Sequence, residues 1–215
     1  MNKRFIFYSL IILVSCSSSK KTTGDSQKGW ISLFDGKSFT GWKANDDPNT
    51  FKIVDGTIQV NGTRAHLFYD GPVMNHTFKN FEFKARVMTT AGSNSGIYFH
   101  TEYKPTGWPS KGYEVQVNTS HTDWRRTGSL YNVQDVKETY VKDEEWFTEY
   151  IKVVGKHVII MVNEHIVVDY TEPEGIEKTQ GRAEKHIGTG TFALQGHDPK
   201  SKVFYKEVMV KPLPD

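Results

Sequence analysis

Apolar and polar residues alternate in short runs along most of the chain after Trp30. The run 81–87 (FEFKARV) places an apolar residue at every second position and a charged residue at each position between. Because successive side chains of a strand point to opposite faces, this run predicts a strand with one face in a core. No stretch keeps the helical period of about 3.6 residues. The pattern therefore predicts an all-β domain over 29–215.

Turn signals separate the alternating runs. Asp55-Gly56 lies between 51–54 and 57–60, and both residues accept the positive φ angles of a tight hairpin turn. A second hairpin is expected where 163–165 connects 157–162 to 166–170, and a last strand is expected over 203–210. About a dozen such strands, with no fixed-period repeat, favour an antiparallel two-sheet jelly-roll sandwich over a barrel or a propeller.

The first residues follow a different pattern. Two basic residues precede an apolar run over 5–14, which ends at Leu13-Val14-Ser15-Cys16. The run is shorter than the roughly 20 residues that span a bilayer, and its end resembles the lipobox of bacterial lipoproteins. We expect a signal peptide over 1–15, a lipid on Cys16 and a flexible tether over 16–28. The alternative is an uncleaved anchor with an incidental cysteine.

This interpretation predicts a protein of the bacterial cell envelope, held at the outer membrane through the lipid on Cys16 alone. The net charge is +2, but five of the 27 Lys and Arg residues lie in the first 28 positions, beside Asp25 as the single acid. The remainder has 22 basic and 24 acidic residues and no basic cluster, so a nucleic-acid partner is not expected. Cys16 is the only cysteine, which excludes an internal disulfide and a thiolate zinc site.

Three predicted strands carry an unusual polar face. Apolar residues occupy every second position of 113–117, so Glu114, Gln116 and Asn118 project together from the opposite face. If the three strands are neighbours, their polar faces merge into a floor that can bind a sugar by hydrogen bonds. The alternative is an ordinary solvated face, although such faces are rich in Lys, Thr and Glu. The other two strands present Tyr98 and His100 from 95–101, and Gln195 and His197 from 191–197.

The loops between these strands add aromatic and basic residues. Trp108, Trp124 and Tyr131 can stack on the apolar faces of sugar rings. Of the pair Arg125-Arg126, we expect one guanidinium in the site and one outside it. The chain has no nucleophile elbow, phosphate-binding loop, dinucleotide fingerprint or His-Glu-x-x-His motif, which excludes the corresponding enzyme classes. No cofactor is expected, but His100, Glu114 and His197 leave a divalent metal open.

Several landmarks occur in a fixed order along the chain: LFDGKSFTGW at 33–42, NSGI at 94–97, YEVQ at 113–116, TGSLY at 127–131, EW at 145–146 and LQGH at 194–197. This order resembles that of the 3-keto-disaccharide hydrolase family. This resemblance implies a concanavalin A-like jelly roll, secretion in bacteria, and cleavage of glycosides whose sugar is oxidised at carbon 3. His100 and Phe147 depart from it, since the family often has Arg and Asn there.

A glycosidase with two catalytic carboxylates is disfavoured, because the strand 113–117 offers a single one. A ketone at carbon 3 permits elimination by one base, followed by hydration. We expect Glu114 to be the base and either His197 or Tyr131 to be the acid. The rival hypotheses are a carbohydrate-binding lipoprotein without catalysis, and a structural envelope protein. The expected substrate-binding residues are Asn94, His100, Gln116, Trp124, Arg125 and Gln195.

The anchoring interpretation is tested by Cys16→Ala. We expect this variant to lose lipidation, because the thiol accepts the lipid, and to accumulate as an unprocessed or soluble form. Membrane fractionation and incorporation of a labelled fatty acid measure both effects, with Ser17→Ala as the control. Unchanged processing and fractionation of Cys16→Ala would show that the lipobox interpretation is wrong.

Overall fold

The computed structural model describes residues 28–178 and 184–215. The predicted signal peptide, Cys16 and all of the tether except Lys28 lie outside these residues. Within them, no helix is long and apolar enough to cross a membrane. The strands are β1 (Ile31–Ser32), β2 (Trp42–Ala44), β3 (Phe51–Val54), β4 (Thr57–Val60), β5 (Ala65–Tyr69), β6 (Phe81–Thr89), β7 (Ser95–Thr101), β8 (Tyr113–Val117), β9 (Phe147–Val154), β10 (His157–Val162), β11 (His165–Thr171), β12 (Thr191–Gly196) and β13 (Val203–Pro212).

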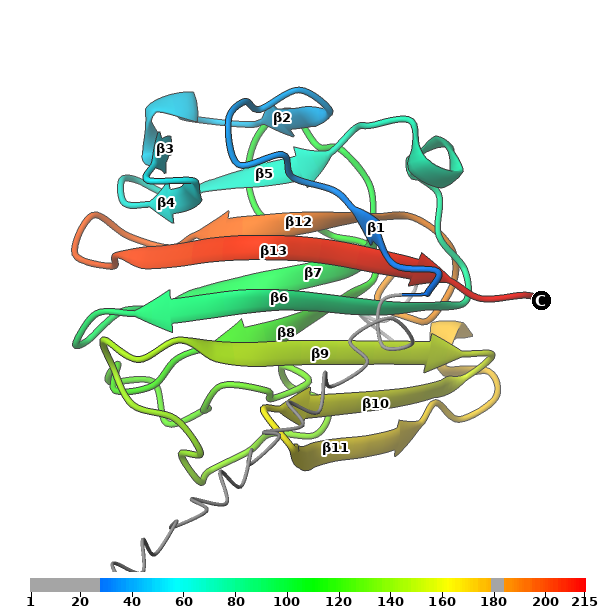
Figure 1. Cartoon of the computed structure of the whole chain (residues 1–215). Coiled ribbons are helices and arrows are strands. Elements are labelled where there is room, and N and C mark those ends of the chain that lie inside the picture. The colour runs from blue at the N-terminus through cyan, green and yellow to red at the C-terminus, as the bar shows by residue number, and fades with distance from the viewer. Residues whose placement is uncertain (1–27, 179–183) are drawn as a thin grey trace, which may run out of the picture.

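These strands form two antiparallel sheets that pack face to face (Figure 1). The larger sheet has the order β11-β10-β9-β6-β13-β4-β3, with β1 added beside β13. The smaller sheet has the order β2-β5-β12-β7-β8. Three short 3-10 helices, Pro48–Thr50, Val73–His76 and Ile176–Lys178, lie in the connections. The predicted all-β, two-sheet sandwich is confirmed.

The predicted hairpins and the predicted alternation of buried residues are confirmed where the sequence marks both a strand and its turn. Strands β3 and β4 pair as the predicted hairpin, with positive φ angles of 48° at Asp55 and 74° at Gly56. Strand β6 buries every second residue, as its alternation predicts. Strands β10 and β11 also pair, although β11 begins at His165 because Asn163 and Glu164 suffice for the turn.

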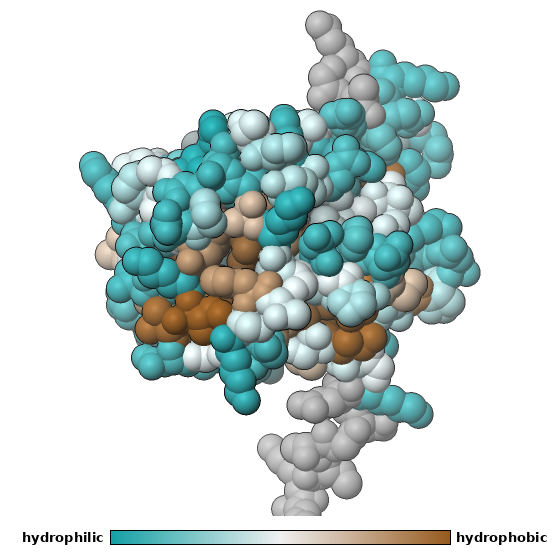
Figure 2. Space-filling model, turned by 90° about the horizontal axis from the view of Figure 1, so that it is seen from above, coloured by the Kyte–Doolittle hydropathy of each residue, from teal (hydrophilic) through white to brown (hydrophobic). Residues whose placement is uncertain are grey.

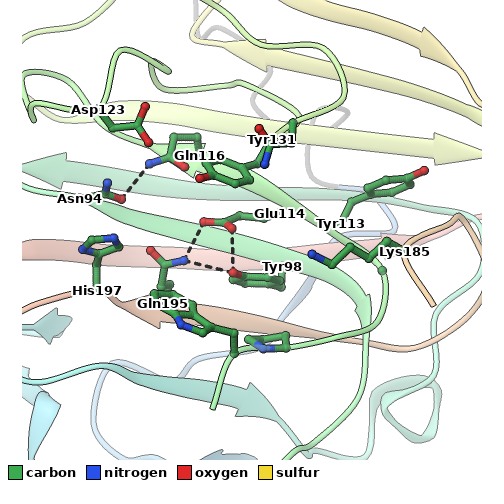
Figure 3. Close-up of a pocket in the computed structure, with 14 residues that line it drawn as sticks. Asn94, Tyr98, Tyr113, Glu114, Gln116, Asp123, Tyr131, Lys185, Gln195 and His197 are labelled. Carbon is green, nitrogen blue, oxygen red and sulfur yellow. Dashed lines mark hydrogen bonds between the residues drawn. The ribbon is translucent and has the colours of Figure 1, made fainter. Parts of the chain in front are cut away.

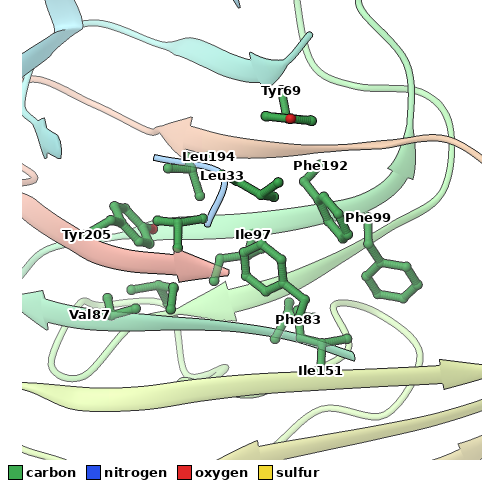
Figure 4. Close-up of a cluster of buried hydrophobic side chains, with 14 of the residues drawn as sticks. Leu33, Tyr69, Phe83, Val87, Ile97, Phe99, Ile151, Phe192, Leu194 and Tyr205 are labelled. Atoms are coloured by element: carbon green, nitrogen blue, oxygen red, sulfur yellow. The ribbon is translucent and has the colours of Figure 1, made fainter. Parts of the chain in front are cut away.

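The hydrophobic core fills the space between the sheets (Figure 4). At its centre, the ring of Phe192 from β12 lies 4.7 Å from Phe78, 4.9 Å from Phe81 and 4.7 Å from Phe83, measured between ring centroids. Offset and edge-on contacts at these distances are favourable for aromatic rings. One end view shows mostly hydrophilic residues around smaller hydrophobic patches (Figure 2). The inward side chains of both sheets pack together in this core and hold the sheets in place. The outward side chains of the smaller sheet are therefore available to form a functional site.

A bulge in β7 places His100 away from the position that the sequence predicted. Between Tyr98 and Thr101, β7 advances three residues while β12 advances two, from Ala193 to Thr191. His100 takes up the extra residue with a φ of 53°. An inserted residue breaks the alternation of side chains, so His100 is buried against Phe81 instead of facing outward. The prediction that His100 lies in the site was wrong.

Phe192→Ala tests the central contact of the core. Removing a fully buried aromatic ring leaves a cavity, so we expect the free energy of unfolding to fall by about 3–5 kcal/mol. Urea denaturation followed by fluorescence measures this change. Phe204→Ala is the matched control, because Phe204 lies on the outer face of β13 and is only partly buried. Equal losses for the two variants would contradict this description of the core.

Candidate active site

The floor of the site is the outward face of β7, β8 and β12. Tyr98 on β7 pairs with Glu114 on β8, and with Ala193 on β12. Gln195 lies two residues beyond Ala193 and therefore projects from the same face. Tyr98, Glu114 and Gln195 line a pocket of about 420 Å³ (Figure 3). The predicted neighbourhood of the three strands is thus present, although His100 does not contribute to it.

The Glu114 carboxylate lies at the centre of the floor. It accepts a hydrogen bond of 2.7 Å from the Tyr98 hydroxyl at Oε2 and one of 2.7 Å from Gln195 Nε2 at Oε1. Burial raises the pKa of Glu114 to about 7, although the hydrogen bonds from Tyr98 and Gln195 favour the ionised form. A carboxyl group with this pKa can take up and release a proton near neutral pH.

Gly96 makes room for this carboxylate. A Cβ atom on Gly96 would lie 2.4 Å from Glu114 Oε1 and 3.0 Å from the Glu114 carboxyl carbon. Any other residue at position 96 would push the carboxylate away from Tyr98 and Gln195. The glycine of the NSGI motif is therefore required by the space that Glu114 occupies.

A pair of amides forms the next part of the floor. Gln116 Nε2 donates a hydrogen bond of 2.7 Å to Asn94 Oδ1. Asn94 Nδ2 lies 3.3 Å from Nδ1 of His121, which belongs to a loop at the edge of the pocket. Both amides are almost fully buried, yet both line the pocket. Their remaining polar atoms can contact sugar hydroxyls, as predicted for Asn94 and Gln116.

His197 lies at the rim of the pocket and is oriented by Asp198. The Nδ1 atom of His197 is 2.8 Å from Asp198 Oδ2. Burial alone would raise the pKa of Asp198, but hydrogen bonds from His197, the Ser201 hydroxyl and the Lys200 backbone amide lower it to about 2. Because Asp198 is ionised, the proton of neutral His197 belongs on Nδ1, and Nε2 keeps a free lone pair.

The rim also holds the one group of described residues that is close enough for a metal. His121, His197 and Asp198 offer ligand atoms that lie within 4.8 Å of one another. Two atoms of these side chains already accept hydrogen bonds: the Asp123 amide donates to His121 Nδ1 over 3.1 Å, and the Ser201 hydroxyl donates to Asp198 Oδ2 over 2.7 Å. A metal ion bound through these two atoms would have to displace those hydrogen bonds. The metal set suggested by the sequence was wrong, because His100 lies outside the pocket.

Trp108, Tyr131 and Lys185 form the walls of the pocket. The Tyr131 backbone amide donates a hydrogen bond of 3.0 Å to the Glu114 carbonyl oxygen, which holds Tyr131 beside the floor. Burial raises the pKa of the Tyr131 hydroxyl, so this group stays protonated at neutral pH. Lys185 adds a positive charge that favours ionised Glu114. The pocket therefore combines a carboxyl group with a raised pKa, an aromatic wall and a cation.

Two predicted substrate contacts lie outside the pocket lining. Trp124 is 46% exposed and is not among the residues that line the pocket. The Arg125 guanidinium forms salt bridges of 3.3 Å with both Asp123 and Asp135, and its carbon lies 4.7 Å from the centre of the Tyr131 ring. Arg125 therefore supports Tyr131 from behind. Arg126 does not line the pocket either; it bonds to carbonyl oxygens of its own loop, so the expectation of one arginine in the site was wrong.

The structure thus brings together six of the predicted residues and adds others. The sequence predicted Tyr98 on the open face, but not the hydrogen bond from its hydroxyl to Glu114. The alternation of β7, together with a carboxylate on a strand expected nearby, could have indicated this contact. No sequence signal marks Lys185, Asp123 or Asn132 as pocket residues. The predicted residues that line the pocket are Asn94, Glu114, Gln116, Tyr131, Gln195 and His197.

Solved structures share this fold. A crystal structure from Parabacteroides distasonis, described as that of a candidate glycosyl hydrolase, is 24% identical with a TM-score of 0.75, covering 90% of this chain and 98% of that one. The carbohydrate-binding module CBM66 from Bacillus subtilis is 11% identical with a TM-score of 0.57, covering 80% of this chain and 96% of the module. At these identities the similarity establishes the sandwich fold alone.

Sequence comparison identifies the family. A curated protein of Bacteroides thetaiotaomicron, named 3-keto-disaccharide hydrolase, is 28% identical over 169 residues, which cover 66% of this chain and 58% of the relative. The chain therefore matches less than two thirds of that protein. The family model of the 3-keto-alpha-glucoside-1,2-lyase-like domain matches residues 29–211, which is nearly all of the predicted domain. The chain thus belongs to the family of 3-keto-alpha-glucoside-1,2-lyase-like domains.

Proposed function

We propose that this protein cleaves glycosides of 3-keto sugars by elimination and subsequent hydration, with Glu114 as the base. The single observation that carries the proposal is the buried Glu114 carboxyl group on the pocket floor, with a pKa of about 7. Carboxylates with such raised pKa values are typical of proton transfer at active sites. The family membership and the named relative support the same substrate class.

A mechanism with two catalytic carboxylates fits this pocket less well. Asp123 is a second carboxylate in the lining, but Arg125 contacts both of its oxygens, at 3.3 and 3.4 Å. The Arg125 backbone amide also donates a hydrogen bond of 3.0 Å to Asp123 Oδ1. Both Asp123 oxygens are thus held by Arg125, so Asp123 is poorly placed to act as a second catalytic carboxylate. Glu114 therefore acts without a carboxylate partner.

The elimination conserves atoms and charge with one base and one acid. The ketone at carbon 3 acidifies the proton on carbon 2, which Glu114 removes. The electron pair forms a double bond between carbons 1 and 2, the bond from carbon 1 to the glycosidic oxygen breaks, and the leaving oxygen receives a proton. Water then adds its oxygen to carbon 1 while a proton returns to carbon 2. The net result is hydrolysis of the glycoside.

His197 is the better candidate for the acid. The contact of its Nδ1 atom with Asp198 leaves Nε2 as the ring nitrogen available to pass a proton to the leaving oxygen. The raised pKa of the Tyr131 hydroxyl makes that group a weaker acid, so Tyr131 acts as a hydrogen-bond donor to the sugar. Lys185 and the amides of Asn94 and Gln116 stabilise the negative charge that develops on the ketone oxygen.

Glu114→Gln tests the base. The amide of this variant can keep hydrogen bonds to Tyr98 and Gln195, because the Tyr98 hydroxyl can rotate to accept one. The amide cannot take up the carbon 2 proton. We expect turnover of a 3-keto-glucoside to fall by about 100-fold or more while thermal unfolding is unchanged. Glu82→Gln is the control, since Glu82 lies on the larger sheet, beside Lys211. Sugar binding without turnover in the wild type would favour a carbohydrate-binding protein instead.

The pH dependence of turnover tests the environment of Glu114. Tyr98→Phe removes a hydrogen bond that stabilises the ionised carboxylate, so the pKa of Glu114 should rise above its value of about 7. Because the base is active when ionised, activity is lost as pH falls through this pKa. The acidic limb of the kcat/KM profile should therefore move to higher pH in Tyr98→Phe, with a severalfold loss at pH 7. An unmoved limb would assign that ionisation to another group.

A further inference from the structure

Two buried polar groups lie beside each other next to the pocket without hydrogen-bond partners. Within the described residues, neither ring nitrogen of His66 nor the Oε1 atom of Gln195 has one. His66 on β5 and Gln195 on β12 are direct cross-strand partners, and both are at most 1% exposed. Gln195 uses only its Nε2 atom, toward Glu114 and Tyr98, and its oxygen points away from Glu114 (Figure 3).

Such groups need an explanation, because nearly all buried polar atoms in native proteins are hydrogen-bonded. The neighbours of His66 are aromatic: its ring centroid lies 5.4 Å from that of Tyr98 and 5.3 Å from that of Trp108. Contacts of an N–H group with an aromatic face are weaker than an ordinary hydrogen bond. Burial lowers the pKa of His66 to about 3, so the ring is neutral, with one donor and one acceptor.

The Trp108 ring lies against His66, although Trp108 itself is partly exposed to solvent. The residue is 42% exposed, and its ring also lies 5.8 Å from that of His197. The preceding residues are tied down: Asn45 Nδ2 donates to the carbonyl oxygens of Lys104 and Gly107, and Asp46 accepts from the Gly107 amide. Gly107 itself has a φ of 84° with open space around it. The Trp108 side chain therefore follows an anchored segment that ends at a glycine.

The strand order shows how His66 and Gln195 lie relative to Glu114. Hydrogen bonds join Glu114 on β8 to Tyr98 on β7 and to Gln195 on β12, which lies two residues along its strand from the partner of Tyr98. His66 on β5 is the cross-strand partner of Gln195. Three strand spacings amount to roughly 14 Å, which is on the scale of two linked sugar rings. The pocket accommodates a ring over Glu114, and the covered groups lie where a second ring would follow. A sugar hydroxyl, which both donates and accepts, complements His66 and Gln195 Oε1.

We propose that Trp108 covers a second subsite, in which His66 and Gln195 Oε1 bind hydroxyl groups of the leaving sugar when the Trp108 ring swings aside. This inference rests on the proposed function, because it assigns the departing half of the same substrate. It makes His66 a residue that determines specificity for disaccharides over glycosides with a small leaving group. It also gives a reason for a histidine at position 66, where an apolar ring would pack without leaving a buried nitrogen unpartnered.

His66→Phe tests the subsite in the full chain, with a 3-keto-disaccharide of glucose and methyl 3-keto-glucoside as probes. Phenylalanine fills the same space and removes both nitrogens, so thermal stability should be unchanged or higher. We expect kcat/KM for the disaccharide to fall about tenfold, the effect of a lost hydrogen bond, with no change for the methyl glycoside. His165→Phe, on distant β11, is the matched control and should change neither.

The outcomes separate this inference from the proposed function. If the wild type cleaves both probes and His66→Phe leaves their ratio unchanged, the subsite is overturned and the proposed function stands. If the wild type neither binds nor cleaves either probe, both are overturned. A fall for the disaccharide alone, in a variant that unfolds at the wild-type temperature or above, supports the subsite.

Acrylamide quenching of tryptophan fluorescence provides a second test that does not depend on the folding of a His66 variant. In the Glu114→Gln background, in which turnover should be slow, the disaccharide should increase quenching because the Trp108 ring becomes more exposed, and the methyl glycoside should not. Trp108→Phe in the same background should remove the difference, while Trp30→Phe should retain it. Equal quenching with both probes would overturn the movement of Trp108.

Discussion

Burial of the Glu114 carboxylate is the constraint on which the arrangement of the site depends. A charged group without water is costly unless it receives hydrogen bonds, and Glu114 receives them from Tyr98 on β7 and Gln195 on β12. The absence of a side chain at Gly96 leaves the space that the carboxylate needs. Three adjacent strands thus cooperate to hold one group, and its pKa of about 7 follows from the balance between burial and those hydrogen bonds.

Two other buried polar residues hold the loops that form the pocket walls. Asn118 donates to the carbonyl oxygens of Asp123 and Arg125, over 2.8 and 2.7 Å, and accepts from the His121 amide over 2.9 Å. Glu172 accepts hydrogen bonds from the Tyr113 hydroxyl and from the Ile187 amide, two residues beyond Lys185. Because networks of satisfied buried groups are rigid, these contacts position the walls while the loops remain free of regular structure.

The same sandwich serves proteins with different activities, so the chemistry must come from the residues placed upon it. The carbohydrate-binding module CBM66 shares the fold at 11% identity. The pocket of this chain holds a buried carboxyl group with a raised pKa, together with His197 paired to an ionised Asp198. Those features are needed for proton transfer and are not required for binding alone.

The sequence by itself determined the features that depend on neighbouring residues. Alternation predicted the strands and the outward faces of Glu114, Gln116 and Gln195, because the two faces of a strand follow from a local period of two. Asp55-Gly56 predicted its hairpin for the same kind of reason, since the turn geometry is set by the residues within it. The lipobox at Cys16 is likewise a local pattern, and it remains a prediction.

Only the tertiary structure decided which of those residues meet. Gln195 and Glu114 are 81 positions apart in the sequence and become partners through the strand order β12-β7-β8. The bulge at His100 depends on pairing with β12, and the Tyr131 ring covers Arg125 through packing between loops. Lys185 enters the pocket from a segment without any pattern. These contacts depend on register and loop packing between distant segments, for which a local period carries no information.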